Sequence, residues 1–231
     1  MLRKLSFIWF HHVYPQLASL IATIGIVGLS ACLLIIFILS KLFSEVLERE
    51  AFSFDTNFLL WIHQFANPNL DAVMLAITWL GNPSFVIIVV IVSFFVLWLR
   101  GDRQEAKIFL IACLGAAILN TGLKLFFTKQ RPQLWKGLIT ETSFSFPSGH
   151  ALGSLVLYGL IAYFLATKYP KYSQLIYSLT IILIGAIGLS RLYLGVHWFT
   201  DVIAGYGVGF LWLIICISML KLQKMHQPSI R

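Results

Sequence analysis

The run LASLIATIGIVGLSACLLIIFILS, residues 17–40, contains no charged residue and decides the class of fold. A helix of about 20 apolar residues crosses the hydrocarbon core of a bilayer. The run is longer than the core of a secretory signal peptide, and no small-x-small cleavage site follows it. We therefore expect it to remain in the protein as a membrane-spanning anchor.

The composition of the whole chain agrees with a lipid environment. Of the 231 residues, 59% are hydrophobic and only 11% are charged, whereas a soluble domain carries about 25% charged residues. A surface so poor in charge would aggregate in water. The composition therefore predicts an integral membrane protein and argues against a soluble one.

Five further uncharged runs predict five further spans: residues 72–99, 108–123, 151–167, 172–190 and 202–220. The first of these is too long for one straight crossing and contains Gly81-Asn82-Pro83, and an interior proline breaks a helix. We expect a short surface helix over 71–80 and the span itself over 83–99. The sequence thus predicts an all-α fold, a bundle of six transmembrane helices in a single domain, residues 1–231.

Two shorter patterns add detail to this bundle. Between the first two spans lies the partly apolar stretch FSFDTNFLLWIHQF, residues 52–65, which we expect to form an amphipathic helix in the outer membrane interface. Its Trp61 and His63 suit the headgroup level, and we assign them no catalytic role. Gly205 and Gly209 form a small-xxx-small pattern in the last span, which indicates a helix-packing face.

The distribution of charge predicts the orientation. Six spans place both termini on one side, where the basic residues are Arg3, Lys4, Arg100, Arg103, Lys107, Lys168, Lys171, Lys221, Lys224 and Arg231, against Asp102 and Glu105. The positive-inside rule then predicts cytoplasmic termini in a plasma-membrane protein. The net charge of +8 reflects this topology and contact with the lipid bilayer. We expect no nucleic-acid partner, because no basic run with interleaved aromatic residues is present, and the sequence predicts no oligomeric state.

Charged or titratable residues stand at the ends of four spans. Lys124 ends the third span, His150 begins the fourth, Arg191 ends the fifth, and His197 and Asp201 begin the sixth. Odd spans run outward and even spans run inward, so all five residues are expected at the outer face. Because ionisable residues at membrane depth are costly and usually functional, this convergence predicts a site.

The local spacing of these residues indicates chemistry on an anion. His197 and Asp201 are four residues apart and share one face of a helix, where the carboxylate fixes the tautomer of the imidazole and leaves its other nitrogen free. Ser148 and Gly149 precede His150 at the expected start of a helix, and the N–H groups of a helix N-terminus suit a phosphate. Ser148 is expected either to cap this helix or to donate to an oxyanion.

Three cations complete the set and argue against a metal site. Two histidines and an aspartate are able to bind a metal ion, but Lys124, Arg131 and Arg191 would repel a metal ion and stabilise a bound anion. The guanidinium group is well matched to phosphate oxygens. We therefore expect a phosphate-binding site with no metal and no other cofactor.

The motifs Lys124-x6-Arg131-Pro132, Pro147-Ser148-Gly149-His150 and Ser190-Arg191-x5-His197-x3-Asp201 resemble the three-part signature of the type 2 phosphatidic acid phosphatase superfamily. All signature positions match in order within residues 124–201, and six spans with the motifs on one face resemble the integral-membrane lipid phosphatase branch. The resemblance implies a phosphatase that needs no metal and acts through a phosphohistidine intermediate.

The resemblance also implies a role for each residue. His197 is the nucleophile, Asp201 orients it, and His150 protonates the leaving oxygen and then takes a proton from water. The phosphoryl oxygens are bound by Lys124, Arg131, Ser148, Gly149 and Arg191. The implied substrates are membrane lipid phosphates at the outer face, namely phosphatidate, phosphatidylglycerol phosphate or undecaprenyl diphosphate.

Three alternatives stay open at this point. A phosphotransferase would pass the same phosphoryl group to a lipid or sugar acceptor instead of water. A transporter should contain inverted repeats or broken helices near the midplane, whereas the charges here cluster at one surface and the evident break is at Gly81-Asn82-Pro83. A catalytically inactive lipid-binding relative should have lost His150, His197 or Asp201, and this chain keeps all three.

Overall fold

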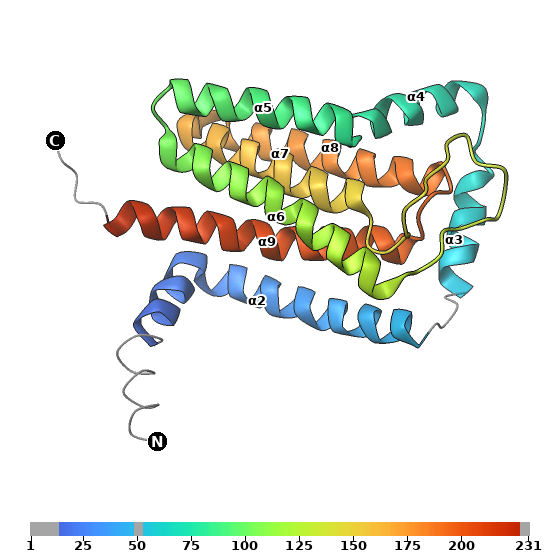
Figure 1. Ribbon diagram of the computed structural model, residues 1–231, viewed down its shortest axis with the longest axis horizontal. Coiled ribbons are helices and arrows are strands. Elements are labelled where there is room, and N and C mark those ends of the chain that lie inside the picture. Colours follow the sequence, from blue (N-terminus) through green and yellow to red (C-terminus); the bar gives the residue numbers. More distant parts are fainter. Residues whose placement is uncertain (1–13, 49–52, 227–231) are drawn as a thin grey trace, which may run out of the picture.

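The computed structural model describes residues 14–48 and 53–226, and within them every regular element is a helix (Figure 1). This confirms the predicted all-α class. The elements are α2 (Tyr14–Leu47), α3 (Ser53–His63), α4 (Pro68–Trp79), α5 (Pro83–Leu99), α6 (Arg103–Phe127), α7 (Gly149–Lys168), the 3-10 turn η2 (Pro170–Tyr172), α8 (Ser173–Tyr193) and α9 (Phe199–His226).

The structure agrees with six membrane spans. Five helices are long and apolar enough to cross a membrane, and α4 and α5 supply a sixth span as a pair bent by 43°. The bend falls at Gly81-Asn82-Pro83, where the Asn82 side chain accepts a hydrogen bond from Ser84 N and Pro83 occupies the first helical position. A proline there fits because its missing N–H would have no partner in the first turn. The predicted helix break is therefore confirmed.

The first span differs from its predicted bounds. The backbone of α2 is interrupted at Gly25, which has a φ of 75°, and the segment suited to the membrane runs over Gly25–Leu47, not over residues 17–40. The helix continues through Lys41 and Glu45. Long charged side chains near a helix end reach the polar interface while their backbone stays helical, so the charges at these positions do not mark the end of the helix.

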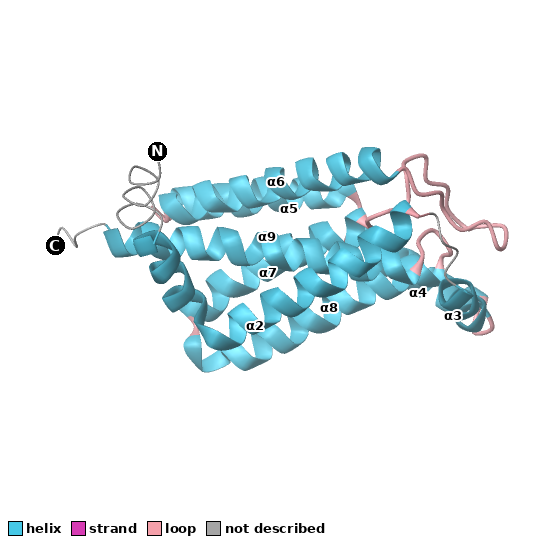
Figure 2. Ribbon diagram, turned by 90° about the horizontal axis from the view of Figure 1, so that it is seen from below, coloured by secondary structure: helices cyan, strands magenta, loops and turns pink. Residues whose placement is uncertain are grey.

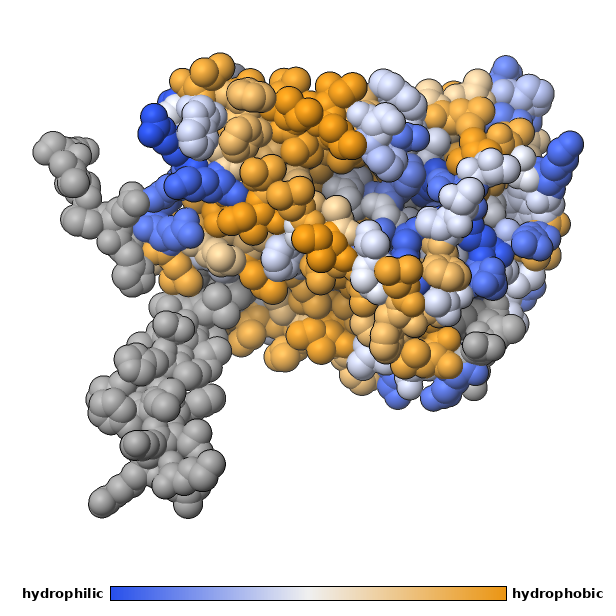
Figure 3. Space-filling model, in the orientation of Figure 1, coloured by the Kyte–Doolittle hydropathy of each residue, from blue (hydrophilic) through white to orange (hydrophobic). Residues whose placement is uncertain are grey.

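The long helices run side by side, with α3 and the segment 128–148 gathered at one end of the bundle (Figures 1 and 2). We call this end the site end and the other the opposite end. In Figure 3 hydrophobic side chains dominate the middle of the molecule and hydrophilic side chains gather toward both ends. Large apolar side chains such as Ile118 and Ile181 are about 70% exposed. An apolar belt of this kind is the surface that a bilayer requires.

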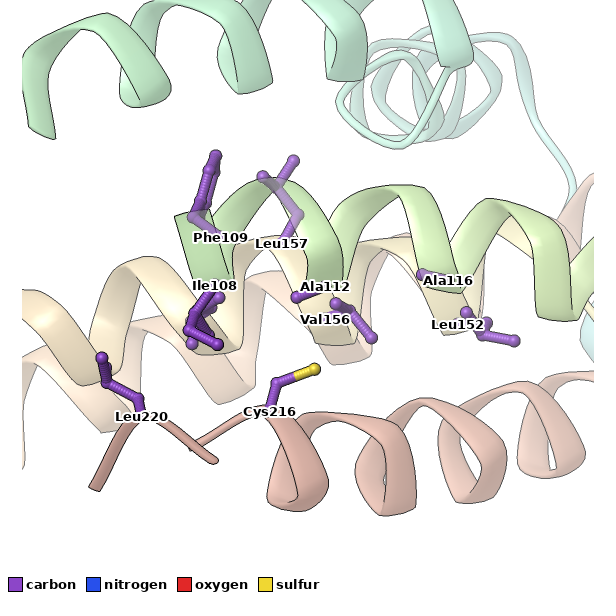
Figure 4. Packing of buried hydrophobic residues seen from close by; sticks show 10 residues of the cluster. Ile108, Phe109, Ala112, Ala116, Leu152, Val156, Leu157, Cys216 and Leu220 are labelled. Carbon is purple, nitrogen blue, oxygen red and sulfur yellow. The ribbon is translucent and has the colours of Figure 1, made fainter. Parts of the chain in front are cut away.

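The buried core lies where α6, α7 and α9 meet (Figure 4). Its members include Ile108, Phe109 and Ala112 of α6, Leu152 and Val156 of α7, and Cys216 and Leu220 of α9. Close to the site end, a Cβ at Gly205 would lie 2.6 Å from Ser148 O, and one at Gly209 would lie 3.0 Å from Leu152 O. The predicted small-residue packing face is confirmed, and the close approach lets Ser148 N donate to Asp201 O at 2.9 Å.

The stretch predicted to lie in the membrane interface forms helix α3, and this helix packs against the bundle. Leu59 and Ile62 are buried in a cluster with residues of the α8–α9 connection, and the Phe58 ring lies 4.8 Å from that of Phe199 at the start of α9. His63 stacks on Trp135 of the segment 128–148, with ring centroids 4.0 Å apart. Helix α3 therefore packs against the start of the last span.

Candidate active site

The residues singled out from the sequence come together at the site end. Six of them line one cavity of about 1300 Å³: Lys124, Arg131, Gly149, His150, Arg191 and His197. Asp201 and Ser148 lie directly behind its wall and are fully buried. The side chains come from α6, the segment 128–148, the facing ends of α7, α8 and α9, and, for His197, the connection between α8 and α9, so the bundle itself brings distant parts of the chain together.

The His197 ring is held by the carboxylate of Asp201. His197 Nδ1 lies 3.3 Å from Asp201 Oδ2, which also accepts the Trp198 N–H at 2.9 Å and the Ser145 hydroxyl. Because an ionised carboxylate only accepts hydrogen bonds, Nδ1 carries the proton and Nε2 keeps its lone pair. The expected tautomer therefore follows from the geometry.

The free nitrogen of His197 faces the cavity and a cation. Arg131 Nη1 lies 3.2 Å from His197 Nε2 and also donates to Val196 O at 2.6 Å. Burial lowers the pKa of His197 to about 4, and the Arg131 and Arg191 guanidiniums act in the same direction against the opposing effect of Asp201. At neutral pH the imidazole is therefore uncharged and its Nε2 is available as a nucleophile.

Lys124 and Arg131 also shape the segment that closes the cavity. Lys124 Nζ donates to Ser143 Oγ at 2.9 Å and to Phe144 O at 2.7 Å. Arg131 Nε donates to Ser143 O at 2.8 Å. The two signature cations thus fold residues 143 and 144 over the site, and desolvation lowers the pKa of the Arg131 guanidinium.

Arg191 is the most buried cation of the site, with 1% of its surface exposed. Its Nη1 donates to Thr78 Oγ1 at 2.7 Å, and its Nη2 forms an ion pair with Glu141. Among the side chains that the structure describes, its Nε is the buried nitrogen without a hydrogen-bond partner. A buried donor left unpaired costs free energy, and Arg191 also lines a cavity that it shares with other cations, which points to an anionic ligand.

Glu141 was not expected from the sequence. Burial raises the pKa of its carboxyl, but the Arg191 and Arg131 guanidiniums outweigh that effect and hold the pKa below its usual range. The carboxylate is therefore ionised and occupies part of the cationic site. Nothing in the spacing of the signature motifs indicated it, because its partners are brought by α8 and by the start of the same loop.

The Ser148-Gly149-His150 stretch forms the start of α7 as predicted. Ser148 is the N-cap residue, and its hydroxyl accepts the Ala151 N–H at 3.4 Å, which is the capping alternative raised from the sequence. A Cβ at Gly149 would lie 2.9 Å from Asn120 Oδ1, and one at Gly81 would lie 2.7 Å from His150 Cδ2. The break between α4 and α5 therefore makes room for the His150 ring.

Two further ionisable residues were missed. Lys129 donates to Asp201 Oδ1 at 2.9 Å, and Asp55 accepts the Thr200 N–H at 3.0 Å and is 2% exposed. Burial raises the pKa of the Asp55 carboxyl, although its hydrogen bonds with Thr200 and the charge of Lys129 oppose this. Lys129 falls between two signature positions, and Asp55 lies in the stretch assigned to the interface, so neither stood out in the sequence.

A metal site was not expected. In residues 14–48 and 53–226 no group of three or more His, Cys, Asp or Glu side chains is arranged to hold a metal ion. The histidines of the cavity face guanidinium and ammonium groups instead.

Comparisons with known proteins place this geometry in a family. The profile described as the PAP2 superfamily matches residues 105–224. Phosphatidylglycerophosphatase B of Bacillus subtilis (strain 168) is 34% identical over 147 residues, which make up 62% of this chain and 72% of that protein.

Solved structures agree with the sequence match. A transmembrane PAP2-type phosphatidylglycerolphosphate phosphatase from Bacillus subtilis superposes with a TM-score of 0.73 at 27% identity, over 88% of this chain and 98% of that one. Aquifex aeolicus LpxE superposes with a TM-score of 0.60 at 24% identity, over 73% of this chain and 97% of that one, which shows a common fold. The chain therefore belongs to the PAP2 superfamily and is a membrane-embedded phosphatase of that family.

Proposed function

We propose that the protein is a metal-independent lipid phosphatase that removes phosphate or diphosphate headgroups through a phosphohistidine intermediate on His197. The observation that carries the proposal is a single cavity in which the unprotonated His197 Nε2 faces buried cationic donors and an apolar extension. A nucleophile, anion-binding groups and a lipid path in one cavity are what such a reaction requires.

Two displacements at phosphorus account for the reaction. In the first, His197 Nε2 forms a bond to phosphorus while the bond to the leaving oxygen breaks, and His150 gives that oxygen a proton. In the second, His150 takes a proton from water, whose oxygen attacks phosphorus and releases His197. A bound phosphate dianion favours the protonated form of His150 before the first step, and Asp201 stabilises the positive charge on His197 during it.

Lys124, Arg131 and Arg191 are proposed to bind the phosphoryl oxygens, with Ser148 and Gly149 at the start of α7. The buried Arg191 Nε, which lacks a partner among the described residues, supports this assignment. In phosphoryl transfer, charge spreads over the oxygens around phosphorus, so fixed cationic donors contribute much of the stabilisation. A phosphate that binds to Arg191 would have to replace the Glu141 carboxylate in its ion pair with this arginine.

The shape of the cavity supports a lipid substrate. Away from the cations it is lined by apolar side chains of α5 and α6, and two of these, Ile87 and Leu114, are also more than half exposed on the lipid-facing surface. A headgroup can therefore lie among the cations while its hydrocarbon chains stay in the bilayer.

The names of the two Bacillus subtilis relatives guide the choice of the first lipid substrate to propose. The two Bacillus subtilis relatives are named for phosphatidylglycerol phosphate, so we propose that lipid first. Phosphatidate and undecaprenyl diphosphate present the same terminal phosphate on a membrane anchor, and they remain candidate substrates for the same site.

We further propose that both termini are cytoplasmic and that the site faces the outside of the plasma membrane. The exposed cations of the opposite end, including Arg103, Lys107, Lys168, Lys171 and Lys221, support this orientation. Excess lysine and arginine mark the cytoplasmic side of membrane proteins.

The test is phosphate release by the purified protein in detergent micelles. Phosphatidylglycerol phosphate, phosphatidate and undecaprenyl diphosphate are compared side by side, with and without EDTA, for the wild type, His197→Ala and the matched His63→Ala. We expect release that EDTA does not abolish, that disappears in His197→Ala at an unchanged thermal midpoint, and that largely persists in His63→Ala. Normal release by His197→Ala would contradict the nucleophile, and no release from any lipid would point to a phosphotransferase that requires an acceptor.

A further inference from the structure

Lys129 lies between two buried carboxylates at the site end. Its Nζ is 2.9 Å from Asp201 Oδ1 and 3.7 Å from Asp55 Oδ2. The lysine side chain is 17% exposed, and those of Asp201 and Asp55 are 0% and 3% exposed. Neither Lys129 nor Asp55 occupies a position of the three-part signature. The three charges form a bridge from α3, through the loop, to the carboxylate behind His197.

The position of the lysine ammonium is fixed from several sides. Thr200 Oγ1 accepts a second hydrogen bond from Nζ at 2.9 Å, and the rings of Phe146 and Trp198 lie 5.6 and 5.9 Å from it. Asp55 in turn accepts both the Thr200 N–H, at 3.0 Å, and the Thr200 hydroxyl, at 2.6 Å. Asp55 therefore holds the start of α9 and the lysine together, and a carboxylate is favoured at a helix N-terminus.

The two oxygens of Asp201 have separate partners. Oδ1 accepts from Lys129, while Oδ2 accepts from Trp198 N, at 2.9 Å, and faces His197 Nδ1 at 3.3 Å. A carboxylate held at both oxygens cannot rotate away from the imidazole. Its charge-assisted hydrogen bond with the lysine also favours the ionised form.

We propose that Lys129, fixed by Asp55, is a positioning residue that holds Asp201 in the orientation from which it presents His197 to phosphorus. The inference rests on the proposed function, because it assumes that His197 is the nucleophile. Lys129 acts through Asp201, whereas Lys124, Arg131 and Arg191 face the cavity itself.

The proposed role of Lys129 predicts a change in the pKa of His197, whereas a purely structural role predicts no such change. The charges around His197 are Asp201 of α9, Arg131, Glu141 and Lys129 of the loop, Lys124 of α6, His150 of α7, Arg191 of α8 and Asp55 of α3. Removal of the Lys129 charge stabilises protonated His197 and raises its pKa. Removal of the Asp55 charge has the opposite effect, since it takes away an anion.

The experiment compares four variants in detergent micelles: Lys129→Met, Lys129→Arg, Asp55→Asn, and Lys136→Met as a matched loss of an exposed lysine from the same loop. The substrate is the lipid that the wild type turns over. Steady-state constants are measured from about pH 3 to pH 8, because an acid limb near pH 4 must be followed in both directions, together with thermal midpoints. The acid limb of kcat/KM reports the ionisation of His197 in the free enzyme.

We expect Lys129→Met to lower kcat about tenfold to a hundredfold, the loss typical of one charge-assisted hydrogen bond, with KM changed less than about threefold. Its acid limb should move to higher pH by roughly half a unit or more, and that of Asp55→Asn to lower pH. Lys129→Arg should recover part of kcat, and Lys136→Met should match the wild type.

Unchanged kcat and an unmoved acid limb in Lys129→Met would overturn the inference. Acid limbs of kcat/KM that move in the same direction in Lys129→Met and Asp55→Asn would also overturn it. Lower thermal midpoints of the variants with unmoved acid limbs would do the same. If Lys129→Met fails to fold, the acid limb of Asp55→Asn tests the inference, because this variant keeps the lysine. Turnover by His197→Ala would instead contradict the proposed function, so the two failures are distinguishable.

Discussion

Both ends of the bundle carry cations, but the two ends use them differently. At the opposite end, Arg100 is 43% exposed and pairs with Asp102, two residues along the chain. At the site end, Arg191 is 1% exposed and pairs with Glu141, 50 residues away in sequence. Local pairs on an exposed surface contribute little to stability, whereas a buried charge needs partners supplied by the fold.

This difference separates charges that orient a membrane protein from charges that perform chemistry. The opposite-end cations are solvated, and some lie over their neighbours' rings, as Lys168 does over Tyr169 at 5.2 Å. The signature cations of the site end, Lys124, Arg131 and Arg191, are partly or fully buried, and Arg191 retains a donor without a partner among the described residues. A desolvated cation beside an open cavity binds an anion much more strongly than a solvated one.

The largest contrast is expected when one arginine is removed from each end. Arg191→Met should lower kcat/KM by about a hundredfold or more, since it removes fixed positive charge from the transition state, whereas Arg100→Met should change it less than about twofold. Phosphate release by both purified variants checks this. Comparable losses at the two ends would show that burial does not distinguish functional cations in this bundle.

A smaller effect is expected from the space around His150. A Cβ at Gly81 would lie 2.7 Å from His150 Cδ2 and 2.9 Å from Ile187 Cγ2, so Gly81→Ala must displace the ring. We expect kcat to fall about tenfold, because an acid that is displaced loses much of its contribution. Gly185→Ala, where a Cβ meets nothing within 4 Å, is the matched control. Equal kcat for the two variants would contradict the role proposed for His150.

The sequence was sufficient to predict the spans and the converging residues, because both are periodic or local patterns. The break at Gly81-Asn82-Pro83 was predicted as a helix stop, but its proximity to His150 was not, since that contact joins positions far apart in the chain. Lys129, Asp55 and Glu141 were missed for the same reason. Their partners, Asp201, Thr200 and Arg191, are brought to them only by tertiary packing.

The start of the first span was also beyond the sequence pattern. The apolar run extends on both sides of Gly25, and only the backbone conformation of that glycine, with a φ of 75°, separates the two parts of the helix. The amphipathic stretch was identified correctly as a helix, but its packing against the start of α9 depends on Leu59 and Ile62 meeting the α8–α9 connection.

Glu141 offers a finer test of the site end. Its carboxylate forms an ion pair with Arg191, so a phosphate that binds to Arg191 must displace the carboxylate. Glu141→Gln should therefore lower the inhibition constant of inorganic phosphate by about threefold, a size typical of a partly exposed ion pair. Inhibition of lipid hydrolysis by phosphate measures this, with Glu45→Gln near the end of α2 as control. A weaker inhibition by phosphate would mean that Glu141 holds Arg191 in place for the ligand.

The smallest expected effect concerns pH. Burial and the neighbouring guanidiniums lower the pKa of His197 to about 4, and a lowered pKa means that the neutral imidazole persists as the pH falls. The rate at which a histidine-acylating reagent inactivates the enzyme should then change less than about twofold between pH 7 and pH 5.5. A solvated histidine would instead lose most of its reactivity over that interval, because its ordinary pKa is about 6.5. Protection by inorganic phosphate identifies the site of reaction. A midpoint near 6.5 would mean that water reaches His197 freely, and the contrast between a desolvated site end and a solvated opposite end would then fail at its most important residue.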